Sequence, residues 1–142
     1  MSKFRQLGLT CALTFAAATV LTACNPPPTA EIGTCLSSAD LESLEVDSLN
    51  PIECTSAHDL EVFAKEDLPD GDFPGEDAIF AAADGLCEDA FADYVGTDYW
   101  ESELDFTYLY PIESSWAVGD REILCMIYSP TDVTSSLKNS NR

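Results

Sequence analysis

Basic residues are scarce in this sequence. The 142-residue chain has 6 Lys and Arg against 26 Asp and Glu, which gives a formal net charge of -20. A surface of this charge repels phosphate polymers, so we expect no nucleic-acid partner. With 46% hydrophobic residues, the chain has enough apolar material for one globular domain and is unlike a disordered tail. The single His, His58, leaves few side chains for acid–base catalysis near neutral pH.

Long apolar runs are also limited, and the clearest one lies near the N-terminus. Residues 7–21 are apolar but too few to cross a hydrocarbon core as a helix, which needs about 20 residues. Lys3 and Arg5 precede this run without any acidic residue. A positive start followed by a short apolar run is typical of a secretory signal peptide, which we predict over residues 1–23.

The end of that run resembles the bacterial lipobox. It reads Leu21-Thr22-Ala23-Cys24, with small residues before a Cys whose thiol would take a diacylglycerol. Two acyl chains, at about 0.8 kcal/mol per buried CH₂, anchor a protein stably. We therefore predict a lipoprotein attached through Cys24 to the outer, extracytoplasmic face of the cell membrane. Three prolines in residues 24–32 favour a short polyproline stalk, with a disordered leader as the alternative.

Four of the six cysteines remain once Cys11 is removed with the signal peptide and Cys24 is lipidated. They are Cys35, Cys54, Cys87 and Cys125. An even number outside the cytoplasm favours two disulfides, but sequence alone does not choose among the three possible pairings. We expect Cys35 with Cys54, in neighbouring segments, and Cys87 with Cys125, between a helix and a core strand. A zinc site is the alternative, but no Cys-x-x-Cys pair is present, and we predict no metal and no cofactor.

One long helix is predicted over residues 76–95. Ile79, Ala83, Cys87 and Phe91 recur there at helical spacing, so one face of the helix should be buried. Gly96 is a natural helix end. Gly85 is the weak point, because Gly costs about 1 kcal/mol inside a helix and could kink or split it.

Alternating apolar residues predict the strands. On residues 121–128, Ile123, Cys125 and Ile127 share one face and Leu124 and Met126 the other. This strand should pair with residues 104–110 as an antiparallel hairpin closed near Gly119. The other strands are expected at 34–37, 52–54 and 60–65. The predicted class is α+β, a small antiparallel sheet with one main helix in the order β-β-β-α-β-β, with residues 33–137 forming the domain and 138–142 a C-terminal tail.

Few residues could carry chemistry. A hypothesis of nucleophilic catalysis would combine His58 and Asp59 with Ser56 or a distant Ser, but the sequence has no Gly-x-Ser-x-Gly motif or oxyanion loop. The favoured interpretation is that the His58 ring forms a hydrogen bond that fixes the turn before the following strand. We therefore predict no catalytic residue and no enzymatic activity.

Two further groups of residues have alternative interpretations. Residues 67–77 hold five carboxylates that could bind Ca²⁺, but their spacing does not match an EF-hand, and a solvated acidic loop is favoured.

A set of aromatic residues in the second half of the sequence could form a contact surface for carbohydrate or protein, or fill the core between helix and hairpin. This set is Tyr94, Tyr99, Trp100, Tyr108, Tyr110 and Trp116. The general acidity either selects cationic partners or adapts the protein to saline growth.

The combined motifs resemble the septum formation family of actinobacterial envelope proteins. Gly33-Thr34-Cys35-Leu36 is similar to its opening segment, and Cys54-Thr55-Ser56-Ala57-His58-Asp59-Leu60-Glu61-Val62-Phe63 to its Cys-x-x-x-His-x-x-Glu-Val-Phe signature. The match covers residues 33–137 and continues through three further segments. These are Phe73-Pro74-Gly75-Glu76-Asp77-Ala78, Tyr108-Leu109-Tyr110-Pro111 and Gly119-Asp120-Arg121. The resemblance implies four disulfide-forming cysteines and a role connected with the division septum, without an assigned reaction.

We therefore expect a membrane-anchored lipoprotein that acts as a non-enzymatic binding or scaffolding module of the cell envelope in septum formation. Its partners would be the membrane, through the lipid anchor, and an unidentified protein or cell-wall component. The alternatives are a ligand- or Ca²⁺-binding surface lipoprotein and, more remotely, an envelope hydrolase that uses His58.

Overall fold

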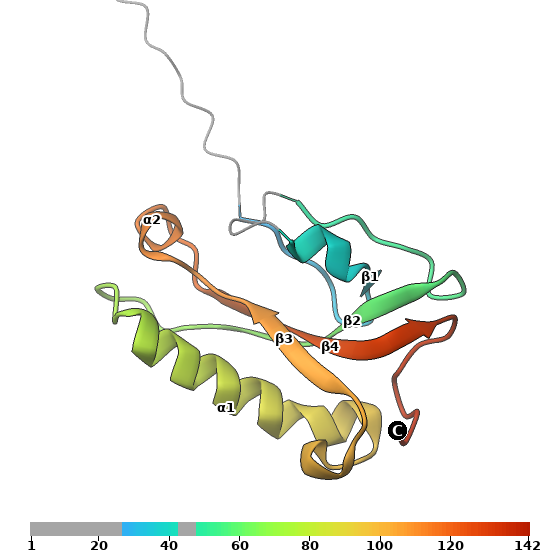
Figure 1. Cartoon of the computed structure of the whole chain (residues 1–142). Coiled ribbons are helices and arrows are strands. Elements are labelled where there is room, and N and C mark those ends of the chain that lie inside the picture. Colours follow the sequence, from blue (N-terminus) through green and yellow to red (C-terminus); the bar gives the residue numbers. More distant parts are fainter. Residues whose placement is uncertain (1–26, 43–47) are drawn as a thin grey trace, which may run out of the picture.

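A computed structural model describes residues 27–42 and 48–142, and it contains one antiparallel sheet with a long helix across one face (Figure 1). The strand order is β1-β2-β4-β3. The strands are β1 Cys35–Leu36, β2 His58–Asp67, β3 Asp105–Leu109 and β4 Glu122–Val133. The helices are α1 Glu76–Val95 and α2 Glu113–Trp116, with 3₁₀ turns η1 Ser38–Leu41 and η2 Tyr99–Glu101. The predicted α+β class is confirmed.

Strand β4 separates two clusters of buried apolar side chains. Ile123, Cys125 and Ile127 face α1 and belong to the larger cluster. Leu124 and Met126 face the other way and pack in a smaller cluster with residues of β1 and β2. This alternation confirms the predicted pattern and arises because successive strand residues point to opposite faces of a sheet.

Helix α1 runs without interruption from Glu76 to Val95. The prediction that Gly85 could kink or split the helix was wrong. Gly85 lies on the exposed side of α1, where no neighbouring side chain packs against it. Gly96 ends the helix in a left-handed conformation with φ 89°, and its N–H donates to the carbonyl of Ala92 at 2.9 Å. A left-handed residue at this position is the usual helix ending, and Gly adopts it without strain.

The predicted strands match the sheet only roughly. The strand expected at 52–54 is a single bridge between Ile52 and Cys35. Strand β2 is longer than predicted because it pairs with β1 on one side and β4 on the other, and β4 extends to Val133 through its pairing with His58. The hairpin of β3 and β4 is antiparallel as predicted, but the short helix α2 lies within its connection.

Both expected disulfides are present. Cys87 of α1 is joined to Cys125 of β4, with Cα atoms 5.6 Å apart, and both residues are fully buried. Cys35 of β1 is joined to Cys54, with Cα atoms 5.4 Å apart. One disulfide therefore links the helix to the sheet, and the other ties the segment before β2 to the edge strand β1.

The ends of the described chain contact the domain. Lys65 of β2 binds the Ala30 carbonyl and the Glu31 carboxylate, at 3.2 and 2.9 Å. At the other end, the Asn139 and Asn141 amides donate to carbonyls at the end of α1. The predicted signal peptide and Cys24 lie outside the described residues. Within the described ranges, no helix combines the length and apolar character needed to span a membrane.

Candidate functional site

His58 begins strand β2 and is almost fully buried, with 2% of its surface exposed. Its Nδ1 lies 2.8 Å from the main-chain carbonyl of Ser56. Because a carbonyl only accepts hydrogen bonds, Nδ1 carries the proton in this contact. The ring therefore fixes the turn before the strand, as predicted, while its Nε2 has no hydrogen-bond partner in the described part of the chain.

The structure does not assemble Ser56, His58 and Asp59 into a triad. His58 contacts the main chain of Ser56, and the Asp59 carboxylate accepts from the amide and the hydroxyl of Ser38, at 2.7 and 2.5 Å. Asp59 thus holds the 3₁₀ turn η1 against the start of β2.

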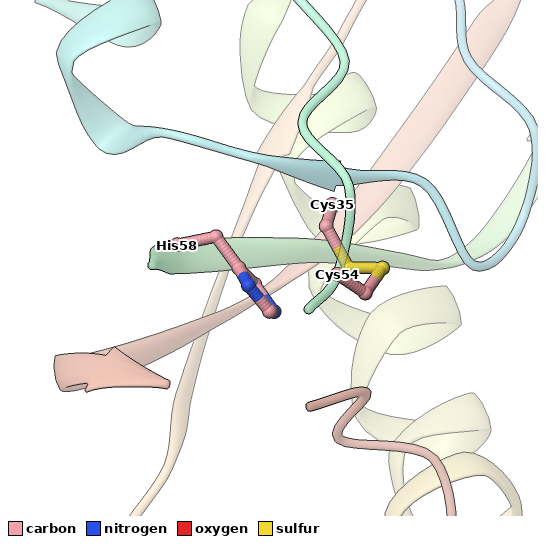
Figure 2. Close-up of side chains that lie close together, drawn as sticks. All are labelled: Cys35, Cys54 and His58. Carbon is pink, nitrogen blue, oxygen red and sulfur yellow. A yellow bond between two sulfur atoms is a disulfide. The ribbon is translucent and has the colours of Figure 1, made fainter. Parts of the chain in front are cut away.

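Cys35, Cys54 and His58 form a compact cluster (Figure 2). The two sulfur atoms and an imidazole nitrogen lie within 4.8 Å of one another, and these are atom types that bind zinc. Zinc binds cysteine as the thiolate, whereas both sulfurs here are joined in a disulfide. In this state the cluster acts as a cross-link beside a packed imidazole.

Glu61 is a fully buried carboxylate that the sequence reasoning left without a role. It accepts hydrogen bonds from the Tyr94 hydroxyl, the Ser136 hydroxyl and the Leu137 amide, each at 2.6 Å. Burial, together with the hydrogen bond to Glu61, raises the pKa of Tyr94 well above its usual value. In the sequence, Glu61 lies on the strand face opposite Leu60 and Val62, shared with Phe63, so the apolar alternation gave no signal that its carboxylate would be buried.

The acidic loop of residues 67–77 is tied to the region of α2. Asp70 lies 3.4 Å from Arg121, and the Trp116 indole N–H donates to the Gly71 carbonyl at 2.9 Å. Arg121 also stacks over the Trp116 ring at 3.8 Å. Across residues 27–42 and 48–142, only the Cys35, Cys54 and His58 cluster brings three potential metal ligands together, so the loop carboxylates do not converge.

The aromatic residues singled out in the sequence divide between core and surface. Tyr94 and Trp116 are buried, whereas Trp100 is 76% exposed. The others line an open groove of about 530 Å³ between α1 and β3, which we call the aromatic groove. Its lining residues are Phe80, Asp84, Tyr99, Asp105, Phe106, Thr107, Tyr108 and Tyr110.

Two carboxylates in the aromatic groove are held by tyrosine hydroxyls. Tyr108 donates to Asp84 at 3.0 Å, and Tyr99 donates to Asp105 at 2.9 Å. Burial and the hydrogen bond to Asp84 raise the pKa of Tyr108 to about 12. The hydrogen bond to Asp105, with a contribution from burial, raises the pKa of Tyr99. Both tyrosines therefore stay protonated and keep the carboxylates oriented.

The tyrosines of this groove were predicted from the sequence as a possible contact surface, but its acids were not. Asp84 follows Phe80 by one helical turn, and this spacing places both residues on the same side of α1. Asp105 begins β3 and meets α1 only through the tertiary fold.

Comparison with known proteins gives one match. The septum formation family matches residues 21–142. No curated protein and no solved structure shows a significant match. Because the matched region covers most of the chain, the chain belongs to the septum formation family.

Proposed function

We propose that this protein is a lipid-anchored extracytoplasmic module that binds a partner during septum formation and catalyses no reaction. The observation that carries the proposal is the family match, which begins at Leu21 inside the lipobox-like sequence and continues to the last residue. The proposed anchor and the folded domain therefore lie within one family unit.

The start of the described chain supports a close attachment to the membrane. Ala30 and Glu31 already contact Lys65 of the sheet. Few residues separate them from Cys24, and an extended chain spans at most about 3.6 Å per residue. A lipid on Cys24 would thus hold the sheet within roughly 20 Å of the membrane surface.

The polar side chains of the signature segment, residues 54–63, form hydrogen bonds that hold the fold together. This supports a binding role over a catalytic one. His58 bonds to the main chain, and Asp59 and Glu61 accept hydrogen bonds from η1, α1 and the C-terminal segment. The aromatic groove offers exposed carboxylates and aromatic faces instead, and such surfaces are suited to recognition.

Deletion and complementation test the proposal. Loss of the gene should delay or misplace septa, and the full-length protein should restore division. Cys24→Ala should fail to restore it at equal protein level, because the protein would leave the membrane. Cys11→Ala is the matched control, since that cysteine lies within the segment predicted to be removed, and it should behave like the wild type.

His58→Ala separates binding from hydrolysis. At an expression level that matches the wild-type amount of folded protein, this variant should still restore division. Its failure at matched folded level would instead favour an envelope hydrolase. Normal septa after gene deletion would overturn the link to division, and full activity of a released Cys24→Ala protein would overturn the anchor.

A further inference from the structure

We propose that the aromatic groove binds an extended segment of a partner protein, with an Arg or Lys side chain held over the aromatic rings and between Asp84 and Asp105. This inference rests on the proposed binding function and names its partner class. Three independent features of the described residues support it: the aromatic faces, the two carboxylates and the unpaired edge of β3.

The aromatic rings of the groove are already packed against one another. Phe80 and Tyr110 have ring centroids 4.9 Å apart, and Tyr99 and Phe106 have centroids 4.8 Å apart. These side chains are only half-buried, so they keep exposed surface toward the groove. Preformed aromatic walls attract cations through the ring quadrupole and suit the apolar stem of a long basic side chain.

The two carboxylates supply charge without a resident cation. Asp84 and Asp105 are exposed, and each uses Oδ1 to accept the hydroxyl of a groove tyrosine. Neither forms an ion pair with Lys or Arg anywhere in residues 27–42 and 48–142. Each therefore retains Oδ2 for a guanidinium or ammonium group, and guanidinium fits such oxygens well.

Strand β3 provides a place for the main chain of the partner. It lies at the end of the strand order and, among the residues that the structure describes, pairs only with β4, so no described strand covers the main-chain groups of its other edge. Phe106 and Tyr108 project from this strand toward α1. An extended segment along the edge could pair with β3 and place one side chain in the groove.

The net charge of the protein favours a positively charged side chain in the partner segment. With a formal net charge of -20, the protein repels acidic segments and attracts basic ones over several ångströms. A neutral sugar could stack on the same rings and donate its hydroxyls to the same carboxylates, but the negative potential of the protein would not attract it as it attracts a cation. The acids of the groove therefore favour a basic protein segment over a carbohydrate.

Peptide binding to the full-length protein in detergent micelles tests the proposal. The probe is a capped five-residue peptide of alternating Thr and Val with a central Arg, and its comparison peptide has norleucine at the centre. We expect the Arg peptide to bind at least about tenfold more tightly than the norleucine peptide, and its affinity to fall with added salt. Equal affinities would overturn the proposal.

Paired variants locate the binding site. Asp84→Asn combined with Asp105→Asn removes two charges but keeps an acceptor for each tyrosine, and it should weaken Arg-peptide binding at least about tenfold. Asp89→Asn combined with Asp93→Asn makes the same charge change at exposed positions of α1 outside the groove and should leave binding unchanged. Equal losses in both variants would indicate unspecific attraction and overturn the site.

Amide hydrogen exchange tests the strand edge. Binding of the Arg peptide should slow exchange in β3, whereas ethylguanidinium alone should not and should bind more weakly. If ethylguanidinium binds as tightly as the peptide, the site recognises a lone cation and the segment proposal is wrong. If the groove variant fails to bind the peptide but restores division fully, the groove is not the division site and the proposed function stands.

Discussion

Glu61 is a buried carboxylate that joins distant parts of the chain. A carboxylate without water is costly unless hydrogen bonds replace its hydration, and here three donors do so. The donors come from α1 and from the segment after β4, so a single side chain of β2 connects three parts of the chain. Glu61 therefore holds the C-terminal segment against β2 and α1 through hydrogen bonds.

We predict that Glu61→Gln destabilises the protein by about 2 to 3 kcal/mol, because the amide removes the charge and turns N–H groups toward existing donors. Urea unfolding with both disulfides intact measures the change. Glu66→Gln, at an exposed position of the same strand, is the control and should cost less than about 0.5 kcal/mol. Equal stability of the two variants would contradict the role of Glu61.

The raised pKa of Tyr108 predicts that the free energy of unfolding falls at high pH. Its folded-state pKa of about 12 lies above the ordinary value of 10.0, so folding favours the neutral phenol. This contribution is fully present below pH 10 and is lost as the pH rises from 10 toward about 12. The difference in tyrosinate absorbance between the wild type and Tyr108→Phe should place the ionisation near pH 12, and a step near pH 10 would contradict the stabilisation of the neutral phenol by partial burial and by Asp84.

At this scale the sequence predicted local contacts better than distant ones. The contact of His58 joins residues two positions apart, so the turn it fixes could be inferred from the motif. The donors to Glu61 lie as far away as Leu137, and the tertiary fold decides their position. For the same reason, the sequence did not show that Asp84 and Asp105 line one groove.

Among the elements, α1 and the hairpin of β3 and β4 were the most predictable. Their apolar spacing is regular, and Gly96 marks the helix end, so local pattern and tertiary packing agree. The edge near residues 52–54 was less predictable, because one bridge and a disulfide hold it instead of a strand ladder. The length of β2 depended on its two neighbours, which the sequence does not reveal.

The two disulfides stabilise different elements and should differ in their effects. The chain-entropy relation assigns about 4 kcal/mol to Cys87–Cys125 and about 3 kcal/mol to Cys35–Cys54, because the first closes a loop of 38 residues and the second one of 19. We predict that the Cys87→Ala and Cys125→Ala double variant unfolds more easily than the Cys35→Ala and Cys54→Ala variant.

Hydrogen exchange distinguishes local from global loosening in these variants. Loss of Cys35–Cys54 should speed exchange in β1 and residues 48–57 while α1 keeps its protection. Loss of Cys87–Cys125 should speed exchange in α1 and β4, since both sulfurs lie in the core. Uniform loosening in both variants would contradict this division of roles.

The whole molecule presents one acidic domain whose signature residues are committed to its own structure. Within the described residues, exposed acids, aromatic rings and a strand edge meet in the aromatic groove. Together with family membership and the proposed anchor, this arrangement supports the proposal of a module that binds a basic segment close to the membrane. This role depends most on where the protein acts in the cell.

Fluorescence localisation of the full-length protein in dividing cells, with a tag that fluoresces outside the cytoplasm, tests the role in septum formation. We predict that the fluorescence of the tagged protein is enriched at forming septa over the lateral membrane, and that Cys24→Ala loses the membrane signal. A uniform envelope signal through the whole division cycle would contradict a role in septum formation.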